Sequence, residues 1–314
     1  MKELLRSNNK IIINSDIDGV LSGLILTNFA NCEVVGFSNS DTTVWIDNSK
    51  INSIYDAVYI DMFVANNNVK CIDQHIVSVN EQHHRILNAN TNKLNPNFDN
   101  PRYHLPNNSY YNKYPFGTIH YLIAILESEG IRVDLNFMNP VGQIYFIDLL
   151  LRADDAMKTT VDSNYMANAS SWWQWLMQKS GNARSISTMR QYLNTLNGVR
   201  VSSIKQTTTT ILTNPSTFGC SSPDGGYKSI IDNRGRLLSK VVNYFNFIAQ
   251  ASSLDCFDTN LNLTPYIGRV NRVSLTNNQI AELINQNSIN GDSIFSYAFV
   301  RSANRGENFS YTIM

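Results

Sequence analysis

The chain has 314 residues, a formal net charge of zero and a hydrophobic share of 43%. This length suits one large domain or two modest domains with a substantial core, and the balanced charge gives no argument for a general polyanion binder. The four cysteines are scattered without a CxxC pair, so neither a zinc knuckle nor a disulfide framework is expected. The first apolar run is too short for a signal peptide or a membrane span, so we expect a cytoplasmic protein with no membrane partner.

Short apolar runs that end in polar residues dominate the first 75 positions. A β-branched run at 10–14 is followed by the acidic turn SDIDG and an apolar stretch with helical periodicity, which predicts strand, loop and helix. Strand-like runs follow at 32–40, 42–47, 56–63 and 69–75. In a parallel α/β sheet, ligands bind beyond the carboxyl ends of the strands. The side chains expected there are Asp16, Asp18, Asp61, Asp73 and His75.

The middle of the chain changes from polar to helical character. Residues 77–113 are polar and rich in Asn and Pro, which favours an extended surface loop with His83 and His84 exposed to solvent. Helices are predicted at 115–130, at 142–157 and, around three tryptophans assigned to packing, at 170–180.

The C-terminal part is predicted to contain further helices and a hairpin. The helices fall at 183–198, 235–252 and 275–286, where Thr276 is a suitable N-cap, and the hairpin turns at 303–308. The Gly-, Ser- and Pro-containing segment 219–226 indicates an exposed turn or linker near a boundary.

These elements predict an α/β protein. A parallel-sheet domain occupies residues 1–185, a helical connector and linker 186–235, and a smaller α+β domain 236–314. The site is expected in the cleft between the two domains.

Carboxylates from separate strand ends repel one another, so their convergence is expected only where a divalent cation compensates the charge. Oxygen ligands with one imidazole favour Mn²⁺ or Mg²⁺ over Zn²⁺. Two such ions could clamp a phosphate and activate a water, which is hydrolytic phosphodiester chemistry.

The motifs also resemble the DHH phosphoesterase superfamily, which includes RecJ-type exonucleases and nanoRNases. The segment NSDIDG is similar to its first motif, H-x-D-x-D-G, with Asn14 at the leading histidine. YIDM is similar to the second motif, CIDQH to the third with Gln74 at the middle histidine, and RADDAM to the fourth. The resemblance covers about the first half of the chain.

The resemblance implies a role for each matching residue. Asp61 and His75 are the expected catalytic residues, and the metal ligands implied are Asp16, Asp18, Asp61, Asp73, His75 and Asp154, with Asp155 as the alternative to Asp154. The terminal segment SYAFVRSANRGEN resembles a strand of the family's accessory substrate-binding domain, which implies substrate contacts by Arg301, Ser302 and Arg305. Arg269 and Arg272 could line the same cleft.

The leading hypothesis is therefore a Mn²⁺- or Mg²⁺-dependent phosphodiesterase of exonuclease type with two ions. Its substrate would be a nucleotide or the end of a short single-stranded nucleic acid, and a homodimer is compatible with the sequence. Two alternatives stay open. Asn14 and Gln74 favour a catalytically inactive relative that binds a nucleotide or a protein, and D-x-D-G-V-L also opens the phosphatases of the HAD superfamily.

Overall fold

The computed structural model describes residues 9–100, 112–133, 135, 163–181, 206, 209–300 and 309–314. Along the chain, its helices and strands are β1 Lys10–Asn14, α2 Ile17–Phe29, β2 Glu33–Ser38, β3 Thr43–Asp47, β4 Val58–Ile60, β5 Cys71–Ile72, α3 Glu81–Ala89, β6 Lys93–Leu94, α4 Pro96–Asp99, α5 Thr118–Ser128, α7 Ser163–Lys179, α10 Ser239–Ser252, β7 Leu263–Ile267, β8 Arg269–Val273, α11 Asn277–Gln286, β9 Ser288–Ile289, β10 Asp292–Ser293, β11 Ser296–Phe299 and β12 Phe309–Ile313.

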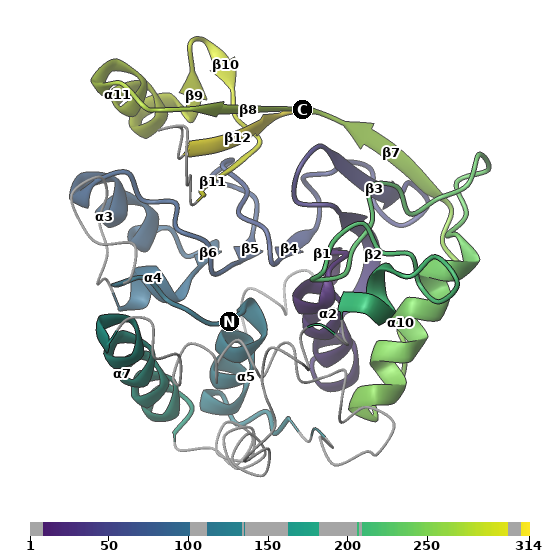
Figure 1. Cartoon of the computed structure of the whole chain (residues 1–314). Coiled ribbons are helices and arrows are strands. Elements are labelled where there is room, and N and C mark those ends of the chain that lie inside the picture. Colours follow the sequence, from purple (N-terminus) through teal and green to yellow (C-terminus); the bar gives the residue numbers. More distant parts are fainter. Residues whose placement is uncertain are drawn as a thin grey trace.

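A seven-stranded sheet forms the centre of the molecule, in the order β6-β5-β4-β1-β2-β3-β7 (Figure 1). The strands from β6 to β2 pair in parallel, whereas β3 and β7 join in antiparallel pairings. The α/β class is therefore confirmed, with a sheet that is mostly rather than wholly parallel. Because β6, β5, β4, β1 and β2 run in one direction, the loops after them meet at one edge.

The two faces of the sheet carry separate apolar cores. Ile11 and Ile13 of β1 point into the first core, which α2, α5, α7 and α10 cover. Ile12 points into the second core, which contains apolar residues of α11, β11 and β12. Figure 1 shows these helices on one side of the sheet and the yellow C-terminal part on the other. The alternation follows from the two-residue period of a strand, and both faces of β1 are buried.

The C-terminal boundary differs from the predicted one. Helix α10 packs against α2, and β7 pairs along its whole length with β3, so residues 239–267 belong with the large sheet and not with the small domain predicted from 236. The small unit contains the sheet β11-β12-β8 and helix α11. Gly268 separates β7 from β8, so one nearly continuous strand runs from the large sheet to the small one.

The closing hairpin, the N-cap of α11 and the presence of a helix within 115–130 are confirmed. Strands β11 and β12 pair in antiparallel register, although residues 301–308 lie outside the described part. Thr276 caps α11 by accepting from Gln279 N, and α5 lies within the predicted range 115–130. The predicted helices at 142–157 and 183–198 lie outside the described residues.

The polar stretch after residue 77 is more ordered than predicted. It contains α3, β6 and α4, and His83 and His84 are buried, which contradicts their predicted exposure. Asn80 starts α3 by accepting from His83 N, and the helix then places both imidazoles against the protein. Asn residues form caps and turns, so a high Asn content did not mean an irregular surface loop.

The turn predicted at 219–226 is confirmed, but its residues Gly225 and Gly226 are buried. Ile17 N donates to the carbonyl oxygen of Asp224, and Gly225 forms a β-bridge with Asp16. Residues 224–225 therefore pack on the acidic turn after β1. Among the described helices, none is long and apolar enough to cross a membrane.

Candidate metal centre

The turn after β1 places Asp16 at the start of α2. Asp16 is the N-cap of this helix, and its Oδ1 accepts from Gly19 N at 3.0 Å. A Cβ atom at Gly19 would lie 2.2 Å from the carbonyl oxygen of Asn14, so only glycine allows the helix to begin this close to the strand. The D-x-D-G sequence is thus a strand-to-helix turn that leaves Asp16 at the carboxyl edge of the sheet.

Asp18 lies in the first turn of α2 and contacts the first turn of α5. Its Oδ2 accepts from Thr118 N at 2.8 Å, and its Oδ1 accepts from Ile119 N at 2.9 Å. Free N–H groups at a helix N-terminus favour a carboxylate. A Cβ at Gly117 would lie 2.5 Å from Asp18 Oδ2, so this approach also requires glycine.

Asp61 follows β4 in an uncommon backbone conformation, with φ of 62°. Its backbone N–H still donates to Ile72 O at 2.8 Å, which holds the residue against β5. The side chain is 2% exposed and receives two hydrogen bonds, from Thr118 Oγ1 at 2.6 Å and from Asn14 Nδ2 at 3.2 Å. A left-handed conformation in a residue other than glycine is strained and is frequent at functional sites.

Asp73 and His75 follow the adjacent strand β5. Asp73 is fully buried, and both of its carboxyl oxygens contact His75. Oδ1 lies 2.7 Å from His75 Nδ1, and Oδ2 accepts from the backbone N of His75 at 3.0 Å. When Asp73 is ionised it only accepts, so Nδ1 donates to it, and Nε2 carries the lone pair when the ring is neutral. The His75 side chain is 40% exposed.

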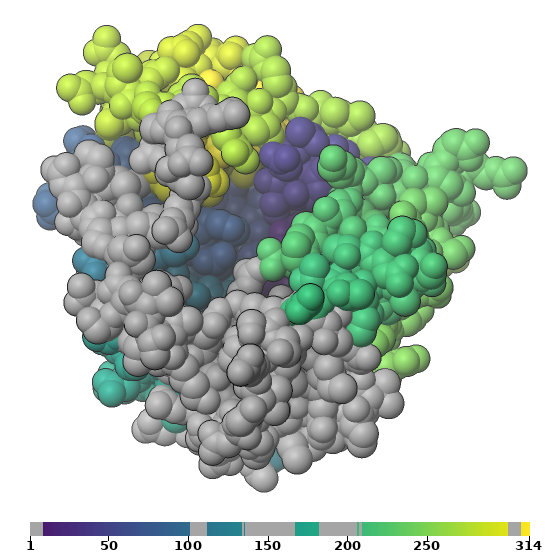
Figure 2. Space-filling model, viewed as in Figure 1, coloured from purple at the N-terminus to yellow at the C-terminus, as the bar shows by residue number. Residues whose placement is uncertain are grey.

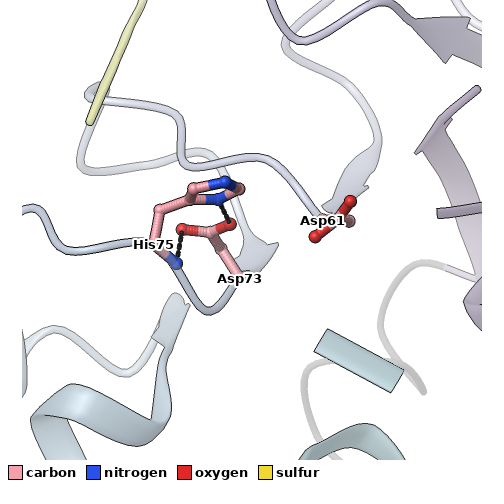
Figure 3. A group of neighbouring side chains, drawn as sticks. All are labelled: Asp61, Asp73 and His75. Atoms are coloured by element: carbon pink, nitrogen blue, oxygen red, sulfur yellow. Dashed lines mark hydrogen bonds and ion pairs between the residues drawn. The ribbon is translucent and has the colours of Figure 1, made fainter. Parts of the chain in front are cut away.

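One ligand atom each from Asp61, Asp73 and His75 lies within 4.8 Å of the other two. Figure 3 shows Asp73 joined to His75 by two hydrogen bonds, with Asp61 to one side of this pair. Two carboxylates and an imidazole are donors that a divalent cation accepts, so the group can hold a metal ion. Asp16 and Asp18 lie beside this group, and their negative charges raise the pKa of Asp61.

The electrostatics of this group favour a cation. Burial raises the pKa of Asp61 well above its usual range, and the negative charges of Asp18, Asp16 and Asp73 raise it further, against the hydrogen bond from Thr118. Desolvation of the His75 ring favours its neutral form, but the Asp73 carboxylate outweighs this effect and raises the pKa of His75. A carboxylate cluster with such an excess of negative charge is stabilised when a metal ion binds.

A cleft of about 320 Å³ opens over the group. Asp61 and His75 line it from the large sheet, and Arg272, Ser296 and Ser310 line it from the small one. Arg272 and Ser310 are cross-strand partners, so β8 and β12 present them together. Figure 2 shows a hollow between the yellow C-terminal part and the green segment, with purple and blue N-terminal residues at its floor.

The structure thus gathers the described sequence candidates at one edge: Asp16, Asp18, Asp61, Asp73 and His75. It places Arg272 in the cleft. Arg269 is exposed instead, and its Nη2 lies 3.5 Å from Asp292 Oδ2. Five further candidates lie outside the described residues: Asp154, its alternative Asp155, Arg301, Ser302 and Arg305. Sequence reasoning missed Thr118, whose only signal was its position after Gly117 at the start of a helix.

Comparisons of the chain with family models, with curated proteins and with solved structures gave no match.

Proposed function

We propose that the protein is a divalent-metal-dependent phosphodiesterase. The observation that carries this proposal is the arrangement of Asp61, Asp73 and His75 within 4.8 Å of one another, in a cleft whose opposite wall carries Arg272. A metal-binding group and an arginine on facing walls suit a ligand with phosphate groups, because both bind phosphate oxygens.

The residues on the sheet side fit a metal ion by their chemistry. Asp61 and the Nε2 atom of His75 would hold the ion, with Asp73 fixing the His75 ring and Asp16 beside them. Oxygen donors with a single nitrogen favour Mn²⁺ or Mg²⁺. A bound ion of this kind polarises a phosphoryl oxygen and lowers the pKa of a coordinated water. The resemblance to DHH phosphoesterases supports two ions, with Asp18 and Asp154 completing the ligand set.

The residues on the other wall would bind the substrate. The Arg272 side chain is exposed, and among the described residues it has no hydrogen-bond or ion-pair partner. A guanidinium binds phosphate in a bidentate manner, and the hydroxyl of Ser310 adds a neutral donor beside it. Arg272 would thereby orient a phosphate of the substrate toward the acidic group.

The dimensions of the cleft favour a small substrate. Its volume of about 320 Å³ lies at the lower end of the range for small-molecule sites. We therefore propose a nucleotide or the end of a short single-stranded nucleic acid as substrate.

A second candidate is a catalytically inactive protein that binds a nucleotide or a protein partner through the same cleft. The amide of Asn14 favours it, because Nδ2 donates to Asp16 Oδ2 at 3.0 Å and to Asp61 Oδ2 at 3.2 Å. A neutral donor between two carboxylates partly compensates their repulsion and offers no nitrogen ligand in that orientation.

The test is to titrate Mn²⁺ into the wild type while recording the thermal midpoint, and to measure hydrolysis of bis(p-nitrophenyl) phosphate and of a 5′-phosphorylated dinucleotide. Binding to the native state alone raises stability by about 2.7 kcal/mol at a hundredfold excess over Kd. Asp61→Asn should abolish both effects, and Asp258→Asn, at an exposed position, should change neither. A Mn²⁺ shift without turnover of either ester would favour the inactive candidate, and no shift would overturn the proposal.

A further inference from the structure

The first turn of α5 contacts two acidic residues that come from different segments of the chain. The backbone N–H groups of Thr118 and Ile119 donate to Asp18 at 2.8 and 2.9 Å. The side-chain hydroxyl of Thr118 donates separately to Asp61 Oδ1, at 2.6 Å. One residue of this helix therefore connects the acidic turn after β1 with the aspartate after β4.

Each oxygen of the Asp61 carboxyl group accepts a hydrogen bond from a different residue. Thr118 is fully buried, and its hydroxyl engages Oδ1, whereas Asn14 Nδ2 engages Oδ2. Two donors on the two oxygens fix the plane of the carboxylate. The ψ and χ freedom of an aspartate at a strand end would otherwise allow several orientations, of which only some direct an oxygen toward Asp73 and His75.

The contact of the Thr118 hydroxyl with Asp61 involves different atoms from the contacts that hold α5 against Asp18. The backbone of Thr118, together with Ile119, binds Asp18, and Gly117 permits the close approach. Removing only the hydroxyl leaves these contacts in place. If such a variant lost metal binding, the cause would therefore be a changed orientation of the Asp61 carboxyl group and not a shift of α5.

We propose that Thr118 is a positioning residue of the metal centre, which holds Asp61 through its hydroxyl in the orientation that binds the ion. This inference rests on the proposed metal-dependent function. Residues that orient metal ligands through hydrogen bonds typically contribute about 10- to 100-fold to metal affinity or activity.

The experiment compares Thr118→Val, which keeps the shape but removes the hydroxyl, with Thr118→Ser, which keeps the hydroxyl. Thr27→Val is the matched control, because Thr27 donates to a carbonyl within α2 and lies outside the site. The readouts are the Mn²⁺ dissociation constant by calorimetry, the Mn²⁺-dependent shift of the thermal midpoint, and hydrolysis of bis(p-nitrophenyl) phosphate across Mn²⁺ concentrations. Circular dichroism without metal checks that each variant folds.

We expect Thr118→Val to raise the Mn²⁺ dissociation constant by about 10-fold or more, with Thr118→Ser and Thr27→Val close to the wild type. Equal Mn²⁺ affinity in Thr118→Val and the wild type would overturn the inference, and so would a Thr118→Ser variant as weak as Thr118→Val. Failure of the proposed function looks different, because the wild type itself would then bind no Mn²⁺. If Thr118→Val does not fold, Thr118→Ser against Thr118→Cys supplies the same comparison of a strong and a weak donor.

Discussion

The side-chain amide of Asn14 donates to Asp61 across two adjacent strands, with Nδ2 3.2 Å from Oδ2. The same nitrogen lies 3.0 Å from Asp16 Oδ2. Both partners are carboxyl oxygens, and the amide nitrogen of Asn14 faces both of them. Asn14 therefore acts as a neutral donor between the carboxyl groups of Asp16 and Asp61.

Asn14→His should strengthen metal binding. The variant puts a nitrogen ligand beside Asp16 and Asp61, and imidazole raises affinity for Mn²⁺ more than for Mg²⁺. We expect the Mn²⁺ dissociation constant to fall by about 10-fold, as for a gained metal-site contact. Calorimetric titration measures it, with Asn14→Gln as the control that keeps the amide. An Asn14→His variant with unchanged affinity for Mn²⁺ would show that position 14 does not face the ion.

Asp61→Asn should make the metal-free protein more stable. Burial and three neighbouring carboxylates raise the pKa of Asp61, so its charged form is costly when no cation is bound. Asparagine tolerates the positive φ of this position better than most residues and can still accept from Thr118. We expect a gain of about 0.5–2 kcal/mol in the free energy of unfolding, the range common for relief of a strained site. Urea denaturation in EDTA measures this gain, and a less stable variant would contradict it.

The acidic edge was predictable because it depends on local pattern. Each of β1, β4 and β5 is an apolar run that ends in a polar residue, and parallel strands bring such ends together. Strand direction was not predictable in the same way. The run TTVWID looks like the others, but β3 is antiparallel to β2, so Asp47 lies at the opposite edge and accepts from Ser49 and Asn262.

Contacts between distant segments could not be inferred from one sequence. Thr118 meets Asp61 across 57 positions, and nothing in the sequence around either residue indicates the pairing. The boundary near residue 236 failed for the same reason. The pattern of α10 and β7 showed a helix and a strand, whereas their attachment to the large sheet depends on the pairing of β7 with β3.

Arg272→Gln should weaken substrate binding and leave the fold intact. The side chain is exposed in the cleft, so its loss removes a charged contact to phosphate without creating a buried cavity. We expect KM for a 5′-phosphorylated dinucleotide to rise about 10-fold, equivalent to about 1.4 kcal/mol, with a smaller change in kcat. Steady-state kinetics at fixed Mn²⁺ measures both constants. Arg269→Gln is the matched control on the same strand, and an equal effect of the two variants would argue against a specific role for Arg272.

His83 should make the protein less stable in mild acid. The imidazole is 2% exposed, accepts from Val79 N through Nδ1 and faces Tyr297 Oη through Nε2, so it connects α3 to β11 in its neutral form. Burial, and then the neighbouring His84, lower the pKa of His83 to about 4. The unfolded chain takes up a proton near pH 6.5, so unfolding binds a proton between about pH 6.5 and 4, and stability falls as the pH falls through that window.

The expected loss attributable to His83 is about 1 kcal/mol at pH 5.5 and about 2–3 kcal/mol at pH 4.5, relative to pH 7. His83→Gln removes the titrating group and should flatten the pH dependence of the free energy of unfolding by these amounts, even if the variant is less stable at pH 7. Urea denaturation of both proteins at pH 7, 5.5 and 4.5 gives the double difference, in which the titration of shared carboxylates cancels. Parallel pH profiles for the two proteins would mean that His83 is protonated in the native state, and would contradict the neutral contact between α3 and β11.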